Sequence, residues 1–562
     1  MTIRTTETSP RGNRLQWALA LGVGAALLAA TAPAARADDD EPVTLEPEVV
    51  VGDAVLTKWM REGLAAADDG DYLKAALKFE EITRQGDTST ETVQEAQFQL
   101  GAALYELKLY QSALSRFELI VDAGQTHPKY RKTLEYLLRI ARATGSDPSV
   151  LLKISEYPPE FYPPEQADEL HFLVGQYFFN ESSLSDALTR FQEVSAKSPD
   201  FFVRARYLEG VIDVQQSNLG ADAREVDGEK LQLAAEAFKT VLRVQRDGQH
   251  GDTIDRVAGQ AILALGRLFY STRQYDVAVR YYDEVPEDSE FWLDAVYEVS
   301  WVHYQLKNYP RALGNLHSLN SPYFADQYFP ESRVLQALIL FYNCRYDEAD
   351  LIVRQFVQDY FPLMDKLRGE INQFADPNAF YQWLATLATR EDSEYSLRFK
   401  RIFNAALADK KLRRKFDTVS KLNEEVKRID KLAGPQGATD GLLAQLKGEL
   451  VGYRTLVVGE AGSLAQTRLV RVLSDLRRHL AGALKIKQET LKARRGDSAD
   501  SVLAEQAAAA AAKRIIEADD EHIEWPFTGE YWKDELGSYL YDVDSLCKIE
   551  GEPEGETGGS GE

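Results

Sequence analysis

Small and aromatic residues recur at fixed intervals through the first two-thirds of the chain, and this pattern predicts helices in pairs. A glycine is followed after twelve residues by an alanine, and after four more by an aromatic residue. Four copies keep this spacing in full: Gly63, Ala75 and Phe79; Gly101, Ala113 and Phe117; Gly175, Ala187 and Phe191; and Gly266, Ala278 and Tyr282. A glycine on one helix and an alanine on the next allow two backbones to approach closely, and the ring fills the gap to the following pair.

Three further copies are weaker, and together the copies predict about eight helical pairs over residues 54–362. They are Ser300, Ala312 and Leu316; Ala337, Ala349 and Val353; and Gly210 with Ala234 and Phe238, where the second half is displaced by twelve residues. This displacement predicts a polar loop inserted near residues 219–230. A degenerate pair is expected around Leu134 to Ile154, and Pro199 is expected to end a helix.

The glycine, alanine and aromatic positions resemble the tetratricopeptide repeat, as does a tyrosine three residues before the alanine at Tyr72, Tyr110 and Tyr275. The resemblance implies an all-α superhelix of helical hairpins. Repeats of this kind usually bind other proteins and carry out no chemistry. The resemblance therefore also implies that the concave face, with its tyrosines and carboxylates, binds an extended segment or a helix of another protein.

The next region, residues 363–520, has helical periodicity without the repeat spacing. Apolar residues predict helices over 396–432, 442–458 and 464–491, with a break at Gly434-Pro435, and 504–516 is rich in alanine. We expect a long helical hairpin or coiled coil. The region has a net charge of +6. Its basic stretch, 398–431, is either a solvated helix face or a surface that docks onto acidic residues of its own repeats or of a partner.

Residues 521–550 are rich in aromatic residues, and we predict that this segment docks by its rings. The candidate docking residues are Trp525, Phe527, Tyr531 and Trp532, because rings so closely spaced are costly to leave in water. Residues 521–562 carry a net charge of −10 and residues 38–362 carry −23, so charge favours docking on the basic helices over the repeats. The alternative is a recognition element for a partner. The acidic residues 551–562 are expected to be disordered.

The first 37 residues have the pattern of a secretory signal peptide. Three arginines precede an apolar run from Leu15 to Ala30, and Ala35-Arg36-Ala37 offers small residues for cleavage. Cleavage after Ala37 would leave a flexible acidic stretch, 38–53, and no transmembrane segment; an uncleaved single-span anchor is the alternative. We expect a periplasmic or otherwise exported protein, with a peripheral position at the outer membrane as one option.

The two cysteines leave two states open. In an exported compartment Cys344 and Cys547 either form a disulfide or remain two unpaired thiols. Their positions in the sequence do not favour one state over the other.

Charge and motifs point away from nucleic acid and from catalysis. The formal net charge of −24 would repel nucleic acid. The sequence contains no phosphate-binding loop, nucleophile elbow, His-Glu-x-x-His or Cys-x-x-Cys motif, and its histidines, including His303 and His317, are scattered. We expect no enzyme activity, no cofactor, no metal site and no small-molecule substrate.

The expected function is therefore that of an exported scaffold. The aromatic segment resembles the ends of long repeat proteins in the envelope and gliding-motility machinery of gliding bacteria, and this resemblance implies protein partners in the cell envelope. We expect the superhelix to assemble or stabilise a multiprotein envelope complex. The alternatives are a self-assembling structural protein and a non-catalytic accessory subunit of an envelope-remodelling enzyme.

Overall fold

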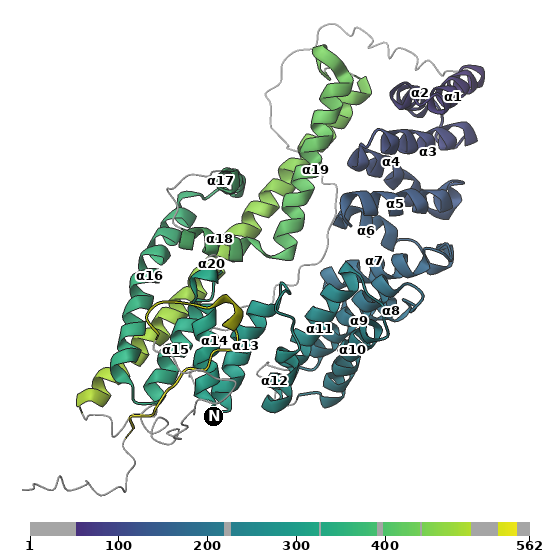
Figure 1. Ribbon diagram of the computed structural model, residues 1–562. Helices are drawn as coiled ribbons and strands as arrows, with labels where there is room; N and C mark the ends of the chain where they lie inside the picture. The colour runs from purple at the N-terminus through teal and green to yellow at the C-terminus, as the bar shows by residue number, and fades with distance from the viewer. Residues whose placement is uncertain are drawn as a thin grey trace, which may run out of the picture. The chain divides into compact units, whose positions relative to one another are not determined.

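The computed structural model describes residues 52–218, 226–324, 327–389, 397–438, 441–495 and 527–547 (Figure 1). Every regular element in these ranges is a helix, which confirms the all-α prediction. The signal sequence, the acidic stretch up to residue 51, most of the insert, residues 504–516, Trp525 and residues 551–562 lie outside the described residues.

Within the described residues, eight helical hairpins follow one another along the chain, and each contacts the next. Their helices are α1 (Asp53–Asp68) and α2 (Tyr72–Gln85), α3 (Glu91–Glu106) and α4 (Tyr110–Ala123), α5 (Tyr130–Thr144) and α6 (Pro148–Ser155), α7 (Ala167–Asn180) and α8 (Leu184–Gln192), α9 (Pro199–Gln216) and α10 (Gly228–Arg246), α11 (Asp252–Ser271) and α12 (Tyr275–Asp283), α13 (Trp292–Gln305) and α14 (Tyr309–Leu319), and α15 (Pro330–Tyr342) and α16 (Tyr346–Gln373). Short 3-10 turns are η1 (Gly124–Thr126), η2 (Pro159–Phe161), η3 (Pro322–Phe324), η4 (Gly434–Gln436) and η6 (Lys533–Glu535).

The turn inside each hairpin contains a residue in the left-handed backbone conformation. These residues have a positive φ: Gly70, Lys108, Ser146, Ser182, Asn218, Arg273, Lys307 and Cys344, and the third turn also contains Gly145. The next N–H closes the turn onto the end of the first helix, as Leu109 does to the carbonyl of Leu104 and Arg345 to that of Leu340, both at 2.9 Å. This left-handed closure satisfies carbonyl groups that the helix end leaves free. The same closure occurs in six of the eight hairpins, and in the third the N–H of Ser146 itself donates to the carbonyl of Ala141 at 2.7 Å. These hairpins therefore share one local turn structure.

The glycines of the repeat pattern lie directly against the aromatic ring that follows sixteen residues later. A methyl group at Gly63, Gly101, Gly175 or Gly266 would lie 2.6, 2.6, 2.7 or 2.8 Å from the ring of Phe79, Phe117, Phe191 or Tyr282, respectively. Gly210 meets Phe238 in the same way at 2.6 Å, across the displaced spacing. The alanines Ala75, Ala113, Ala187 and Ala278 are completely buried. The two helices of a hairpin thus approach closely because no side chain stands between the backbone and the ring.

Two prolines behave differently from the sequence-based expectation. Pro199 opens α9 at its first turn and does not end a helix, because a proline at that position lacks only an N–H that the helix would leave unpaired. Pro362 lies inside α16, so the helix crosses the boundary expected at residue 362. α16 packs against α20, and such tertiary packing supplies most of the stability of a helix.

Four more helices follow the hairpins: α17 (Pro377–Thr389), α18 (Leu397–Leu407), α19 (Lys410–Ala433) and α20 (Gly441–Arg495). The expected helix over 396–432 is interrupted, because the Asp409 side chain accepts from the N–H of Leu412 at 3.0 Å and starts a new helix. The two helices expected over 442–458 and 464–491 are one continuous helix. Gly462 lies inside α20, where a methyl group would be 1.9 Å from the carbonyl oxygen of Pro377. This glycine serves close packing against the start of α17, not a break.

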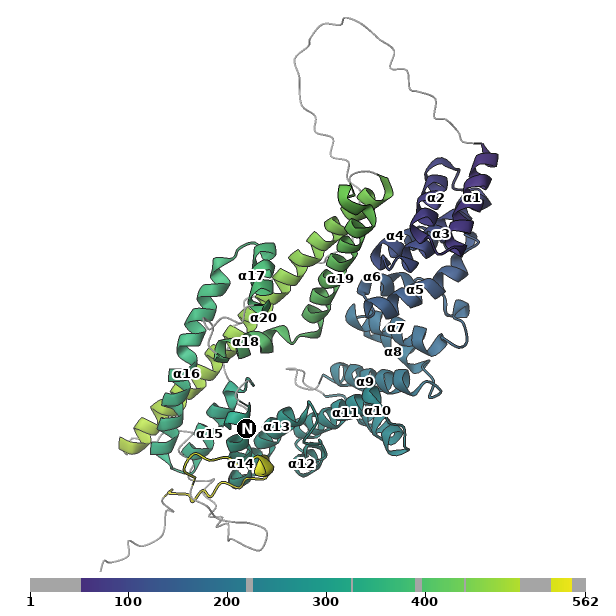
Figure 2. The same ribbon diagram turned by 45° about the horizontal axis from the view of Figure 1, so that its top comes forward.

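The hairpin of α19 and α20 docks on the chain's own repeats (Figure 2). The Thr418 hydroxyl donates to Asp147 at 2.6 Å, and Arg428 donates to the carbonyl of Lys108 at 2.6 Å. Lys421 donates to the carbonyl of Thr144. These contacts fall on the turns inside the second and third hairpins. Of the two interpretations of the basic stretch, the structure therefore shows docking within the chain.

Candidate functional site

The C-terminal residues 527–547, which we call the strap, lie along α14 and reach the turn between α15 and α16 (Figures 1 and 2). The Gly537 N–H donates to the Ser318 hydroxyl at 2.8 Å. The N–H of Tyr541 donates to the carbonyl of Pro310 at 3.0 Å, and that of Leu546 donates to the carbonyl of Asn343 at 2.9 Å. Residues 537–546 of the strap are thus held through their backbone.

Small residues on α14 make room for the strap. Pro310, Gly314 and Ser318 follow one another at intervals of four and so share one face of the helix. A methyl group at Gly314 would lie 1.7 Å from the carbonyl oxygen of Tyr539. Gly314 and Ser318 are both buried.

Three aromatic rings of the strap surround His317 on α14. Its ring stacks on Tyr531 with centroids 4.5 Å apart, and the edges of Phe527 and Tyr539 approach at 4.6 and 5.1 Å. Burial, with Arg333 nearby, lowers the pKa of His317 to about 4. The histidine is therefore neutral at physiological pH and acts as an aromatic surface.

The candidate docking residues have different surroundings. Phe527 and Tyr531 both contact His317. Phe527 is nevertheless 49% exposed, and Trp532 is 41% exposed. Leu536, Tyr539 and Val543 are the buried residues of the strap, so its anchoring depends on residues that the sequence analysis did not single out. Trp525 lies outside the described residues.

The expectation that this segment docks on the basic helices is wrong. Its hydrogen bonds and ring contacts are with α14 and the α15–α16 turn, which belong to the acidic repeats. Short-range packing and hydrogen bonds decide the position, because charge attraction between exposed groups is screened beyond about 8–10 Å. The sequence did carry a signal: α14, Tyr-Pro-Arg-Ala-Leu-Gly-Asn-Leu-His-Ser-Leu, has a single charged residue.

A disulfide between Cys344 and Cys547 closes the strap. Cys344 occupies the left-handed turn position of the eighth hairpin, and Cys547 is the last described residue of the strap. Of the two states left open by the sequence, the structure thus shows the paired one. The bridge joins residues 203 positions apart.

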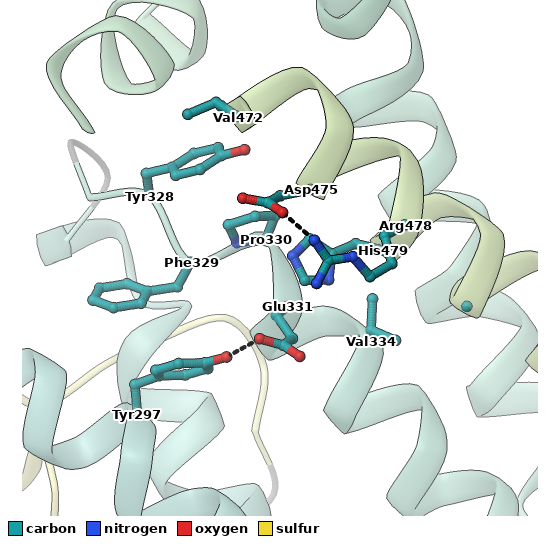
Figure 3. A pocket seen from close by; sticks show the side chains of 11 residues that line it. Tyr297, Tyr328, Phe329, Pro330, Glu331, Val334, Val472, Asp475, Arg478 and His479 are labelled. Atoms are coloured by element: carbon teal, nitrogen blue, oxygen red, sulfur yellow. Dashed lines mark hydrogen bonds and ion pairs between the residues drawn. The ribbon is translucent and has the colours of Figure 1, made fainter. Parts of the chain in front are cut away.

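A pocket of about 540 Å3 lies beside the last two hairpins, between α13, the start of α15 and α20 (Figure 3). Aromatic side chains form one wall: Tyr297, Tyr328 and Phe329. Val334 and Val472 add apolar surface, and α20 contributes Asp475, Arg478, His479 and Gly482. The pocket depends on α20 crossing the first helices of these hairpins, so no repeat pattern could have predicted it.

The polar groups of the pocket are few and mostly paired. Tyr297 donates to Glu331 and accepts from the Trp301 indole at 3.3 Å, and Arg478 pairs with Asp475. Burial raises the pKa of Tyr297 and lowers that of His479, so both groups are uncharged near neutral pH. The Tyr328 hydroxyl is buried and has no hydrogen-bond partner among the described residues. Such a lining suits an apolar or aromatic side chain that also carries a hydrogen-bonding group.

The described residues contain no cluster of three or more His, Cys, Asp or Glu side chains that could hold a metal ion. Among the helices that the structure describes, none is long and apolar enough to cross a membrane. His303 and His317 lie on adjacent helices and both have lowered pKa values because they are buried.

Comparison with known proteins agrees with this geometry. Residues 60–128, which span α1 to α4 and η1, match the tetratricopeptide repeat family. These residues are tetratricopeptide repeats. Beyond the matched residues, the same glycine–aromatic contact recurs at Gly175, Gly210 and Gly266. A search of curated proteins found no match.

Three solved structures resemble the chain at low identity. A tetratricopeptide repeat protein from Parabacteroides merdae is 13% identical over 54% of this chain and 93% of its own, with a TM-score of 0.23. The apo form of RapI is 15% identical over 62% of this chain and 95% of its own, with a TM-score of 0.30. A chain of the APC/C hetero-tetramer Cut9–Hcn1 is 11% identical over 79% of this chain and 97% of its own, with a TM-score of 0.20.

Proposed function

We propose that this tetratricopeptide repeat protein is an exported scaffold that assembles or stabilises a multiprotein complex of the cell envelope. That the repeats form a protein-interaction scaffold follows from the family match and from the row of eight helical hairpins. The export and the envelope complex are the proposed part. The single observation that carries the proposal is the tetratricopeptide match at the start of an unbroken row of hairpins.

Two features of the chain support export. The first 37 residues have the basic start, apolar run and small-residue site of a signal peptide. Cys344 and Cys547 form a disulfide, and such bridges persist in oxidising compartments and are rare in the cytosol. The two features are independent of each other.

We propose the pocket between α13, α15 and α20 as the place where a partner side chain is held. It combines an aromatic wall with the Tyr328 hydroxyl, which has no partner among the described residues. An aromatic or aliphatic side chain that also accepts a hydrogen bond would fill it. A partner segment lying along the first helices of the last hairpins would place such a side chain there.

A cell-based capture experiment tests the proposal. Partners would be cross-linked and recovered with the full chain from its native cell, and compared with those of Gly482→Leu, which places a large side chain in the pocket. Gly482 has only Val334 nearby, at 3.7 Å, so the added side chain points into open space. We expect envelope proteins to be recovered with the wild type and to be lost with Gly482→Leu.

Gly448→Leu is the matched control, because Gly448 lies on the same helix with open space around it. Equal recovery with both variants would argue against the pocket as the binding site. Recovery of cytosolic proteins alone would overturn the envelope role.

A further inference from the structure

The face of α14 that the strap covers has the features of a peptide-docking surface. It supplies a carbonyl acceptor at Pro310, a hydroxyl acceptor at Ser318 and an aromatic surface at His317. It also lacks a side chain at Gly314, where the strap backbone comes closest. These groups recognise an extended backbone flanked by aromatic rings.

We propose that this face is a docking surface for an extended aromatic segment of a partner. In the oxidised chain the protein's own strap occupies it, and reduction of the Cys344–Cys547 bridge frees it. This inference rests on the strap contacts and on the disulfide, and it needs neither the pocket nor the envelope role.

The bridge acts as a latch because it fixes the far end of the strap covalently. Apart from the disulfide, the strap is held by the hydrogen bonds to α14 and Asn343, by Arg345, which donates to the Asp544 carbonyl at 3.2 Å, and by a few side chains. Phe527, Trp532 and Leu546 stay 49%, 41% and 64% exposed. With the bridge intact, the strap is tethered at both ends, and its effective concentration at the face exceeds that of any free competitor. With the bridge broken, the strap is joined covalently to the rest of the protein only through the chain between residues 495 and 527. Its effective concentration at the α14 face is then lower, so a partner segment can compete with it for this face.

The opening step is a thiol–disulfide exchange with a dithiol reductant. A thiolate of the reductant attacks one sulfur of the bridge, forms a mixed disulfide and expels the other cysteine as a thiolate, which takes up a proton. The second thiol of the reductant then attacks the mixed disulfide and releases the remaining cysteine. The reductant ends as a disulfide, and Cys344 and Cys547 end as two thiols. Both cysteines are partly exposed, so a reductant can reach the bridge.

Hydrogen exchange of the full chain tests the latch. The informative amides are those of Tyr541 and Leu546, which donate to the carbonyls of Pro310 and Asn343. We expect both to exchange at least tenfold faster after reduction with dithiothreitol, while amides within α1 to α12 keep their rates. Cys547→Ser should reproduce the reduced behaviour without reductant. Unchanged exchange at the two amides in both the reduced chain and Cys547→Ser would overturn the proposal.

Binding of a labelled synthetic peptide of residues 527–546, which lacks the cysteine, tests the surface. We expect it to bind the reduced full chain at least tenfold more tightly than the oxidised chain. Gly314→Ala should weaken binding to the reduced chain at least tenfold, because the methyl group takes the place of the peptide backbone. Alanine favours the helix more than glycine does, so α14 should still fold.

The matched control is Gly448→Ala, a glycine-to-alanine change in a helix with open space around it, and it should leave peptide binding unchanged. Equal binding to oxidised and reduced chains, or equal effects of Gly314→Ala and Gly448→Ala, would show that the α14 face is not the docking surface. Failure of the cell-based capture experiment would leave these outcomes unaffected, so the two proposals can fail separately.

Discussion

The carboxylate of Glu425 on α19 accepts a hydrogen bond from the backbone N–H of Gln111, 2.8 Å away, at the first turn of α4. Leu109, the residue before α4, has no side chain that could cap this helix end. A residue more than 300 positions along the chain therefore caps a helix of the second tetratricopeptide hairpin. Glu425 is only 5% exposed, so this hydrogen bond is a buried link between the basic helices and the repeats.

Removal of this cap should destabilise the protein. Glu425→Ala leaves the N–H groups at the start of α4 without a partner, and we expect the free energy of unfolding to fall by about 0.5–2 kcal/mol. Glu424→Ala, an exposed neighbour on the same helix, is the control and should have little effect. Urea denaturation followed by circular dichroism measures both. Equal losses in the two variants would contradict the capping role.

The same residue should make stability depend on pH. Burial raises the pKa of Glu425 to about 7, from an ordinary value near 4.5, although the N–H groups of Gln111, Ser112 and Tyr110 oppose the rise. The folded state therefore favours the protonated form. The stabilisation that protonated Glu425 gives to the folded state is fully present below pH 4.5 and is lost as the pH rises through 7. Glu425→Gln should gain stability relative to wild type at pH 8 and lose this advantage at pH 5, as thermal unfolding at the two pH values would show.

Overpacking a repeat glycine should also be costly. A side chain at Gly175 would collide with Phe191, whose ring lies 2.7 Å from the position of a methyl group. We expect Gly175→Leu to lower the free energy of unfolding by about 1–3 kcal/mol. Gly448→Leu, in open space, should change it much less, and calorimetric melting temperatures compare the two. A melting temperature unchanged by Gly175→Leu would show that the hairpin tolerates wider helix spacing.

Acid should loosen the strap at His317. The pKa of this histidine is about 4 in the folded protein, against an ordinary value of 6.5, because burial and Arg333 disfavour its charged form. The contribution of neutral His317 to the stability of the folded state is therefore complete above pH 6.5 and is lost as the pH falls toward 4. Hydrogen exchange at Tyr541 should therefore accelerate, after correction for intrinsic rates, between pH 6.5 and 4. In His317→Leu this acid-dependent part should disappear, and the strap should also dock less tightly at neutral pH because the ring contacts are lost.

Export predicts a defined mature end. If the signal peptide is cleaved after Ala37, N-terminal sequencing of the protein from its native cell should begin at Asp38. A full-length cytoplasmic product would contradict both the localisation and the envelope role.

The repeat architecture could be predicted from the sequence because its determinants are local. Gly63 and Phe79 lie sixteen positions apart, and each such pair fixes the packing of one hairpin without help from distant parts of the chain. The second helix of the hairpin that contains Gly210 and Phe238 could also be located, because the same local glycine–ring contact is kept although the spacing is longer. Helix ends were less predictable: Pro199 opens a helix and Gly462 lies within one, because neighbouring packing decides how such residues are used.

The row of helical hairpins, the helical character of the later region and the need of the aromatic segment for a surface could all be predicted from the sequence. The folded structure was needed to show which surface that is, that Cys344 meets Cys547, that Glu425 caps α4, and that α20 completes a pocket beside the last hairpins. The difference lies in the sequence separation of the contacts. Hairpin packing repeats about every forty residues and therefore leaves a period in the sequence. The other contacts join residues about 150 to over 300 positions apart, and each of these contacts occurs once in the chain. A contact made once has no period, and the net charge that guided the expectation acts too weakly through solvent to choose among surfaces.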